Sequence, residues 1–158
     1  MVITLNYTAL QAKVERSLSV IGKRTVDDKG ELLFRDITVS TREKEIITDY
    51  FRQAVIDLAA ELTAFISAST DTTITIDLPT NHSNALDAFI TQSCEAYCVS
   101  YALASWFNVT APRLTDKYTS DCTRQSAALV RIIHDKRAPS SASSSPVDIS
   151  TTVVTPNT

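Results

Sequence analysis

Glycine is scarce in this chain, since Gly22 and Gly30 are the only two among 158 residues. Phosphate-binding loops and tight active-site turns depend on glycine, because it takes left-handed backbone angles without steric cost. The sequence contains no glycine-rich phosphate loop, no Gly-x-Ser-x-Gly nucleophile elbow and no His-Glu-x-x-His metal-binding helix. These absences exclude the enzyme classes that such motifs define.

Cysteines and long apolar runs are also few. Cys94, Cys98 and Cys122 make an odd count, which argues against a disulfide framework. Cys94 and Cys98 stand four residues apart in an apolar stretch, where a small buried thiol is the usual role. No run approaches the roughly 20 apolar residues of a membrane span, and the first residues lack a signal-peptide pattern. We therefore expect a protein that is made in a reducing cytoplasm and has no membrane partner.

Positive charge is not in excess, because the formal net charge is −3. The charge is unevenly distributed, however. Residues 71–110 have a net charge of −4, from four acidic and no basic side chains, and residues 111–137 have a net charge of +3, from six basic and three acidic side chains. These two stretches predict either a salt-bridged pair of helices within one chain or an attraction between copies of the chain.

The first 40 residues predict a strand, a helix and a hairpin. Residues 2–7 are β-branched or aromatic enough for a short strand. Thr8-x-x-Gln11 has the form of a capping box, and apolar residues recurring every three to four positions predict a helix over residues 9–21. A turn sequence with two aspartates and a glycine, flanked by β-prone residues, predicts a β-hairpin over residues 25–39.

The clearest helical pattern follows a second capping box, Ser40-x-x-Glu43. It predicts a helix over residues 41–66, which would be roughly 39 Å long at 1.5 Å per residue. Such a length suits a helical bundle or a ring subunit. The apolar stripe of this helix consists of Ile46, Ile47, Tyr50, Phe51, Ala54, Val55, Leu58, Ala59, Leu62, Phe65 and Ile66.

The rest of the domain predicts one strand and two more helices. Alternating apolar and polar residues over 72–78, stopped by a proline, indicate a half-buried strand. Apolar stripes predict helices over residues 84–107 and 112–136. We therefore expect a mainly α fold over residues 1–137, namely a bundle of three long helices with a shorter N-terminal helix and a small β element.

The composition changes after this domain. Residues 138–158 are rich in serine and have a single charged side chain, so they cannot bury enough surface to offset their ordering entropy. Within this segment Val147, Ile149, Val153 and Val154 belong to β-prone patches. We expect an extended C-terminal arm that becomes ordered against a partner, by strand addition or in a groove.

Residue types that bind metals or catalyse reactions are present but poorly placed. Cys94, Cys98 and His82 could approach a zinc ion, but no fourth ligand is apparent and the histidine is three turns away. Cys122 and His134 would lie three turns apart on one helix, beyond hydrogen-bond reach for a nucleophile and its base. The sequence therefore predicts no catalytic residue, no metal and no cofactor.

The candidate interface residues are basic or aromatic. Arg113, Lys117, Arg124 and Arg131 are expected on the outer face of the last helix, although acidic residues stand among them. This helix is the only candidate for a nucleic-acid-binding helix. Trp106 belongs to an aromatic run, with Tyr97, Tyr101 and Phe107, that is typical of a core and, less often, of an interface anchor. A helical binding or regulatory domain, associated with nucleic acid, is thus one alternative function.

The order of elements over residues 40–137 resembles the small helical head-to-tail connector (adaptor) proteins of tailed bacteriophages and the related Mu-type neck proteins. The resemblance is one of pattern over about two-thirds of the chain, without a signature motif. It depends first on a long helix that contains Tyr50-Phe51-Arg52-Gln53-Ala54-Val55-Ile56-Asp57-Leu58, followed by a link that ends in Leu78-Pro79. The next helix closes in Tyr101-Ala102-Leu103-Ala104-Ser105-Trp106-Phe107. The last helix has Tyr118 near its start and Leu129-Val130-Arg131-Ile132-Ile133 near its end.

The resemblance implies a non-enzymatic virion protein of the phage neck. Its partners would be copies of itself in a ring that matches a twelve-fold portal, the portal protein, and a stopper or tail-completion protein. DNA passing through the channel would be a further, transient contact. The hairpin over residues 25–39 and the arm over residues 138–158 are not standard parts of that pattern.

Overall fold

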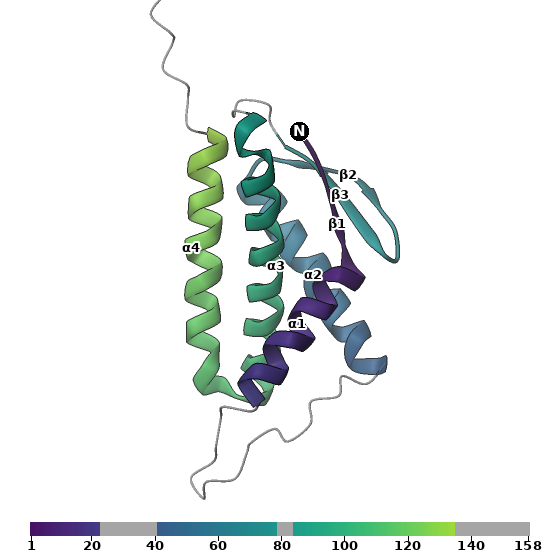
Figure 1. Cartoon of the computed structure of the whole chain (residues 1–158), viewed down its shortest axis with the longest axis vertical. Coiled ribbons are helices and arrows are strands. Elements are labelled where there is room, and N and C mark those ends of the chain that lie inside the picture. Colours follow the sequence, from purple (N-terminus) through teal and green to yellow (C-terminus); the bar gives the residue numbers. More distant parts are fainter. Residues whose placement is uncertain (23–40, 79–83, 135–158) are drawn as a thin grey trace, which may run out of the picture.

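The computed structural model describes residues 1–22, 41–78 and 84–134, and it confirms the mainly α fold (Figure 1). The predicted hairpin over residues 25–39, Ser40, His82 and the arm over residues 138–158 lie outside the described residues. In chain order the described elements are β1 (Val2–Asn6), α1 (Tyr7–Gly22), α2 (Thr41–Glu61), β2 (Phe65–Ser69), β3 (Thr73–Asp77), a 3-10 turn (Asn84–Leu86), α3 (Asp87–Thr110), a second 3-10 turn (Pro112–Leu114) and α4 (Thr115–His134).

The central element is α3. It lies beside α4, while α1 and α2 run obliquely across it (Figure 1). Asp87 and Glu95 are its only charged residues, because a helix with neighbours on several sides has little surface left for solvated side chains. Its buried residues are Ile90, Cys94, Tyr97, Cys98, Ser100, Ala102, Leu103 and Phe107.

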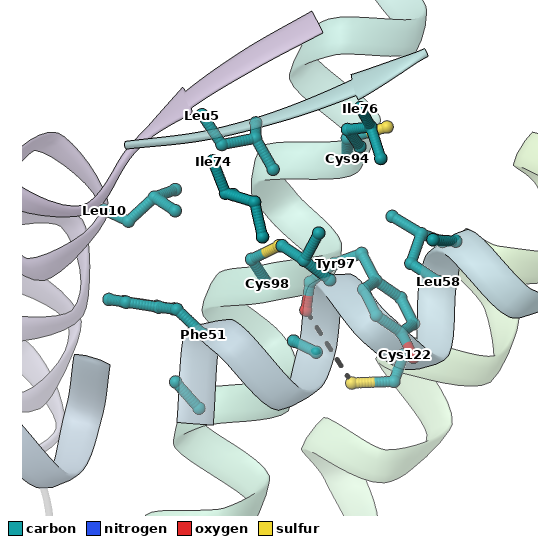
Figure 2. Close-up of a cluster of buried hydrophobic side chains, with 14 of the residues drawn as sticks. Leu5, Leu10, Phe51, Leu58, Ile74, Ile76, Cys94, Tyr97, Cys98 and Cys122 are labelled. Atoms are coloured by element: carbon teal, nitrogen blue, oxygen red, sulfur yellow. Dashed lines mark hydrogen bonds between the residues drawn. The ribbon is translucent and has the colours of Figure 1, made fainter. Parts of the chain in front are cut away.

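The sheet covers one end of the helices and has the strand order β1-β3-β2, with both pairs antiparallel. Ile3 pairs with Ile76 and Leu5 pairs with Ile74, so that four buried side chains lie on the inner face. Figure 2 shows this face packed against Cys94 of α3. Pairing β1 with β3 closes a loop of about 70 residues. The burial of the apolar row offsets the entropic cost of closing that loop.

The first helix begins differently from the prediction. Asn6, the last residue of β1, is the N-cap, because its Oδ1 accepts a hydrogen bond from the Ala9 amide at 3.2 Å. The predicted capping box at Thr8 is therefore wrong. The Gln11 side chain does not reach back along α1 but donates from Nε2 to Thr48 Oγ1 of α2 at 2.7 Å. The residue that was expected to cap one helix thus joins two helices.

The predicted helix over residues 41–66 is wrong at its C-terminal end. α2 ends at Glu61, and Thr63 takes a left-handed φ of 51°. Backbone amides just beyond the helix donate to carbonyl groups of its last turn, as in a Schellman C-cap. Phe65 and Ile66 consequently leave the apolar stripe of the helix and begin β2. No glycine or proline marks the end of α2 in the sequence, so the apolar periodicity predicted a helix that continues beyond Glu61.

The other predicted elements within the described residues agree with the observed bounds to within three residues. The strand over residues 72–78 is β3, and the strand over residues 2–7 is β1. The helices over residues 84–107 and 112–136 are α3 and α4, each preceded by a 3-10 turn. Pro112 opens the second of these turns, where its missing amide hydrogen costs no helical hydrogen bond.

The left-handed Thr63 provides a test of the chain reversal after α2. A β-branched residue in this conformation costs about 1–2 kcal/mol relative to glycine. Thr63→Gly should therefore raise the free energy of unfolding by about 0.5–1 kcal/mol after the greater entropy of the unfolded chain is included. Urea denaturation measures the change. The matched control is Thr123→Gly, at an exposed interior position of α4, which should lower stability by about 0.5 kcal/mol. Destabilisation by both substitutions would contradict the C-cap assignment.

Candidate interaction surfaces

The three cysteines are buried and unpaired (Figure 2). Cys94 and Cys98 lie in α3 under the sheet, and Cys122 of α4 points its Sγ at the Tyr97 carbonyl oxygen, 4.0 Å away. Burial raises the pKa of Cys94 and of Cys122 to about 12, and it raises the pKa of Cys98 as well. All three thiols are therefore protonated at neutral pH, which leaves them unsuited to nucleophilic or metal-ligand roles.

The described histidine and acidic residues do not form a metal site. His134 is exposed at the end of α4. Among residues 1–22, 41–78 and 84–134, no group of three or more His, Cys, Asp or Glu side chains is arranged to hold a metal ion. Within the same residues, no helix is long and apolar enough to cross a membrane.

A groove with a volume of about 430 Å³ runs between α3 and α4 near the end of α2, and we call it the hydroxyl groove. Most of its lining residues bear a hydroxyl group, and Glu61 is the one charged residue; the others are Tyr97, Tyr101, Ala104, Ser105, Asn108, Thr115, Thr119, Cys122, Thr123 and Ser126. Burial, together with the nearby Asp57 carboxylate, raises the pKa of Tyr101 to about 12. Burial and Glu61 likewise raise the pKa of Tyr97. The phenols can therefore donate hydrogen bonds at neutral pH but cannot act as bases.

The predicted basic residues of the last helix share one side of it. Arg113, Lys117, Arg124 and Arg131 are all exposed, and we call them the basic stripe. Lys117, Arg124 and Arg131 follow one another at intervals of seven residues, which places them opposite the buried face of α4 over a length of about 21 Å. Arg113 lies in the 3-10 turn just before this helix. Arg124 donates to Asp121 at 2.7 Å on the same helix. Such an exposed pair contributes little to stability, so the stripe is available for recognition.

The acidic stretch does not pair with this stripe as predicted. Asp71 lies 3.9 Å from Arg52, Asp77 lies 3.6 Å from the Met1 amine, and Glu95 pairs with Lys13 of α1. The predicted salt-bridged helix pair is therefore wrong for these three acids. Instead, α3 and α4 pack through side chains such as Phe107 and Tyr118, whose rings stack at 5.5 Å.

A second exposed surface was missed by the sequence analysis. All five residues of β2 are exposed, and we call this strand with its unpaired side the β2 edge. Phe65 is 79% exposed and Ile66 is 41% exposed. A signal for it existed in the sequence, since Thr70 and Asp71 form a turn between two β-prone runs. In the structure, Thr70 Oγ1 accepts hydrogen bonds from the Thr72 and Thr73 amides.

The remaining predicted interface residues fall into two groups. Trp106 is half-buried and packs against the core, so it is not a free anchor. Val147, Ile149, Val153 and Val154 lie outside the described residues. The structure thus places three of the four basic residues on α4 and Arg113 in the turn before it, and it adds the β2 edge as an unexpected second surface.

The buried thiols make a prediction about reactivity. With a pKa of about 12, roughly one thiol in ten thousand is ionised at pH 8. A thiol-reactive dye should therefore label the native protein negligibly at pH 8 and should label three cysteines after unfolding in urea. The folded protein holds these protons more tightly than the unfolded chain, so stability should fall as pH rises above about 8.5. Rapid labelling of any cysteine in the folded protein would contradict this burial.

No protein-family model, curated protein or solved structure matches this chain. Evidence about function must come from the surfaces of the molecule, namely the hydroxyl groove, the basic stripe and the β2 edge.

Proposed function

We propose that the protein is a structural, non-enzymatic subunit of a tailed-bacteriophage neck. In this proposal it forms a ring with copies of itself under the portal and joins the portal protein to a stopper or tail-completion protein. The main support is that two different exposed surfaces lie on different sides of the molecule. The basic stripe lies on α4, along one side, and the hairpin of β2 and β3 projects on the opposite side (Figure 1).

This arrangement suits head-to-tail association. A ring requires a heterologous contact, in which one patch of a subunit meets a different patch of the next. The hairpin carries two acidic side chains, each within 4 Å of one positive group of the same chain, and α4 carries the basic stripe. Asp71, at the hairpin turn, has a fully exposed side chain, and Asp77 has a half-exposed one. Successive copies can therefore place the basic stripe of one subunit against the acidic hairpin of the next, with attraction between opposite charges.

A non-enzymatic role is supported by the chemistry of the interior. The thiols are kept protonated by burial, and the hydroxyl groove offers hydrogen-bond donors and one carboxylate. Enzymes usually require a nucleophile or base whose pKa lies near the working pH. The lining of the hydroxyl groove includes no histidine, lysine or arginine, and this favours a surface that binds over a site that reacts.

The proposal predicts self-association that depends on both charged surfaces. Reversing the stripe with Lys117→Glu and Arg131→Glu should weaken self-association at least about tenfold, because like charges would then face each other. Adding Asp71→Lys to that variant should restore much of the loss. Sedimentation velocity over a range of protein concentrations measures the association. A control is Arg42→Glu, an exposed charge reversal on α2, which should have little effect. A full-length chain that stays monomeric at every concentration would contradict the proposal.

A second candidate, a helical nucleic-acid-associated regulatory domain, is favoured by the basic stripe alone. Such a domain would bind duplex DNA with an affinity that falls steeply as salt is raised. It would bind as a monomer or dimer, and the Lys117→Glu/Arg131→Glu variant would lose most of this affinity. We expect DNA binding to be weak in fluorescence anisotropy, because Asp116 and Asp121 stand within the stripe. Submicromolar binding at physiological salt by a non-assembling chain would favour the second candidate.

A further inference from the structure

The β2 edge is open to pairing. In the described sheet, β3 has a neighbour on both sides, whereas β2 has a neighbour on one side only. Proteins usually protect such an edge with charged side chains, proline or a bulge, because its free amides and carbonyls attract other strands. β2 has an irregularity between Ile66 and Ala68, but its sequence Phe-Ile-Ser-Ala-Ser contains neither a charge nor a proline. Of these protections, β2 has only the irregularity between Ile66 and Ala68.

The apolar side chains of the sheet indicate where a further strand would lie. Ile3, Ile76 and Ile66 are in register across the three strands. Ile3 and Ile76 are almost completely buried, whereas Ile66 is 41% exposed. The apolar row is therefore buried on β1 and β3 but partly exposed on β2. A fourth strand beside β2 would satisfy the free backbone groups and continue the row over Ile66.

The arm of the chain has the composition that this edge requires. From residue 147 the sequence reads Val-Asp-Ile-Ser-Thr-Thr-Val-Val, which is rich in β-branched residues and has one charge. As a strand, Val147, Ile149 and Val153 would lie on one face, because side chains alternate with a period of two. That face matches the apolar row of the sheet, while Asp148 and Ser150 would face solvent.

We propose that residues 147–154 of one copy add to the β2 edge of the neighbouring copy as a fourth strand. This inference rests on the proposed head-to-tail ring. α4 ends at His134. An extended chain of the length of residues 135–146 would reach up to about 40 Å. This reach exceeds the roughly 30 Å length of α4, so the proposed strand could reach a neighbouring copy. In a head-to-tail contact, the α4 side of one subunit faces the hairpin side of the next. The arm therefore begins beside the edge of its neighbour.

Two full-length variants test this contact. The edge variant, Phe65→Lys/Ala68→Lys, places charges on exposed residues of β2, and the arm variant, Ile149→Lys/Val153→Lys, places them in the proposed strand. Each variant alone should self-associate at least about tenfold more weakly than the unaltered chain. In an equimolar mixture, the intact arm of the edge variant meets the intact edge of the arm variant. The mixture should form 1:1 pairs, by sedimentation velocity, at concentrations where neither variant self-associates.

Controls separate strand addition from general effects of charge. Ser141→Lys/Ser143→Lys adds the same charge to the chain between α4 and the proposed strand, and Ala12→Lys/Ser19→Lys adds it to exposed positions of α1. Both should leave association nearly unchanged. Amide hydrogen exchange should show the β2 amides that do not bond to β3 protected in the assembled unaltered chain and exchanging faster in the arm variant.

Each other outcome overturns the inference. An arm variant that associates as tightly as the unaltered chain, or that keeps the β2 amides facing away from β3 protected to the same degree, shows that the arm does not cover the edge. A mixture that forms no pairs shows that the arm does not pass between copies. In these cases the head-to-tail ring still stands if the unaltered chain assembles. An unaltered chain that remains monomeric overturns the ring and the strand addition together.

Discussion

The burial of α3 is the constraint on which the rest of the structure depends. This helix has eight buried side chains and only two charged ones, so it must be covered on several sides to be stable. α4 covers one side, α1 and α2 cross another, and the inner face of the sheet lies over Cys94 and its neighbours (Figure 2). Each fully buried apolar side chain stabilises the fold by roughly 1.5–3 kcal/mol, which offsets the entropic cost of closing β1 onto β3.

The same packing decides which surfaces remain available to partners. α4 uses Tyr118, Cys122, Leu129 and Ile133 against α3, so its basic residues are left facing solvent. The sheet buries the inner sides of β1 and β3 against the helices, but its third strand extends past this cover. Both surfaces proposed for assembly are therefore consequences of a core centred on one helix. They differ in chemistry because one is a charged helix face and the other an unpaired strand.

Among the described residues, no acidic or basic side chain is buried in the core. Burial that stabilises the helices also raises the pKa of the cysteines and of the two tyrosines at the hydroxyl groove. Groups held in their neutral form at physiological pH pack well and react slowly. In the proposed ring, such a packed core would hold the two complementary surfaces at fixed positions on each subunit. Charge complementarity between α4 and the hairpin turn would then set the direction of association.

The sequence by itself determined the four helices, the burial of the cysteines and the outward position of Arg113, Lys117, Arg124 and Arg131. These features follow from a local period of 3.6 residues, which neighbouring residues define without help from distant ones. The end of α2 at Glu61, the capping of α1 by Asn6 and the exposed β2 edge were decided by the tertiary structure. Phe65 and Ile66 fit a helical stripe equally well, and only pairing with β3 makes them a strand. Strand pairing joins residues far apart in the chain, so its register and its free edge depend on contacts that no local pattern contains.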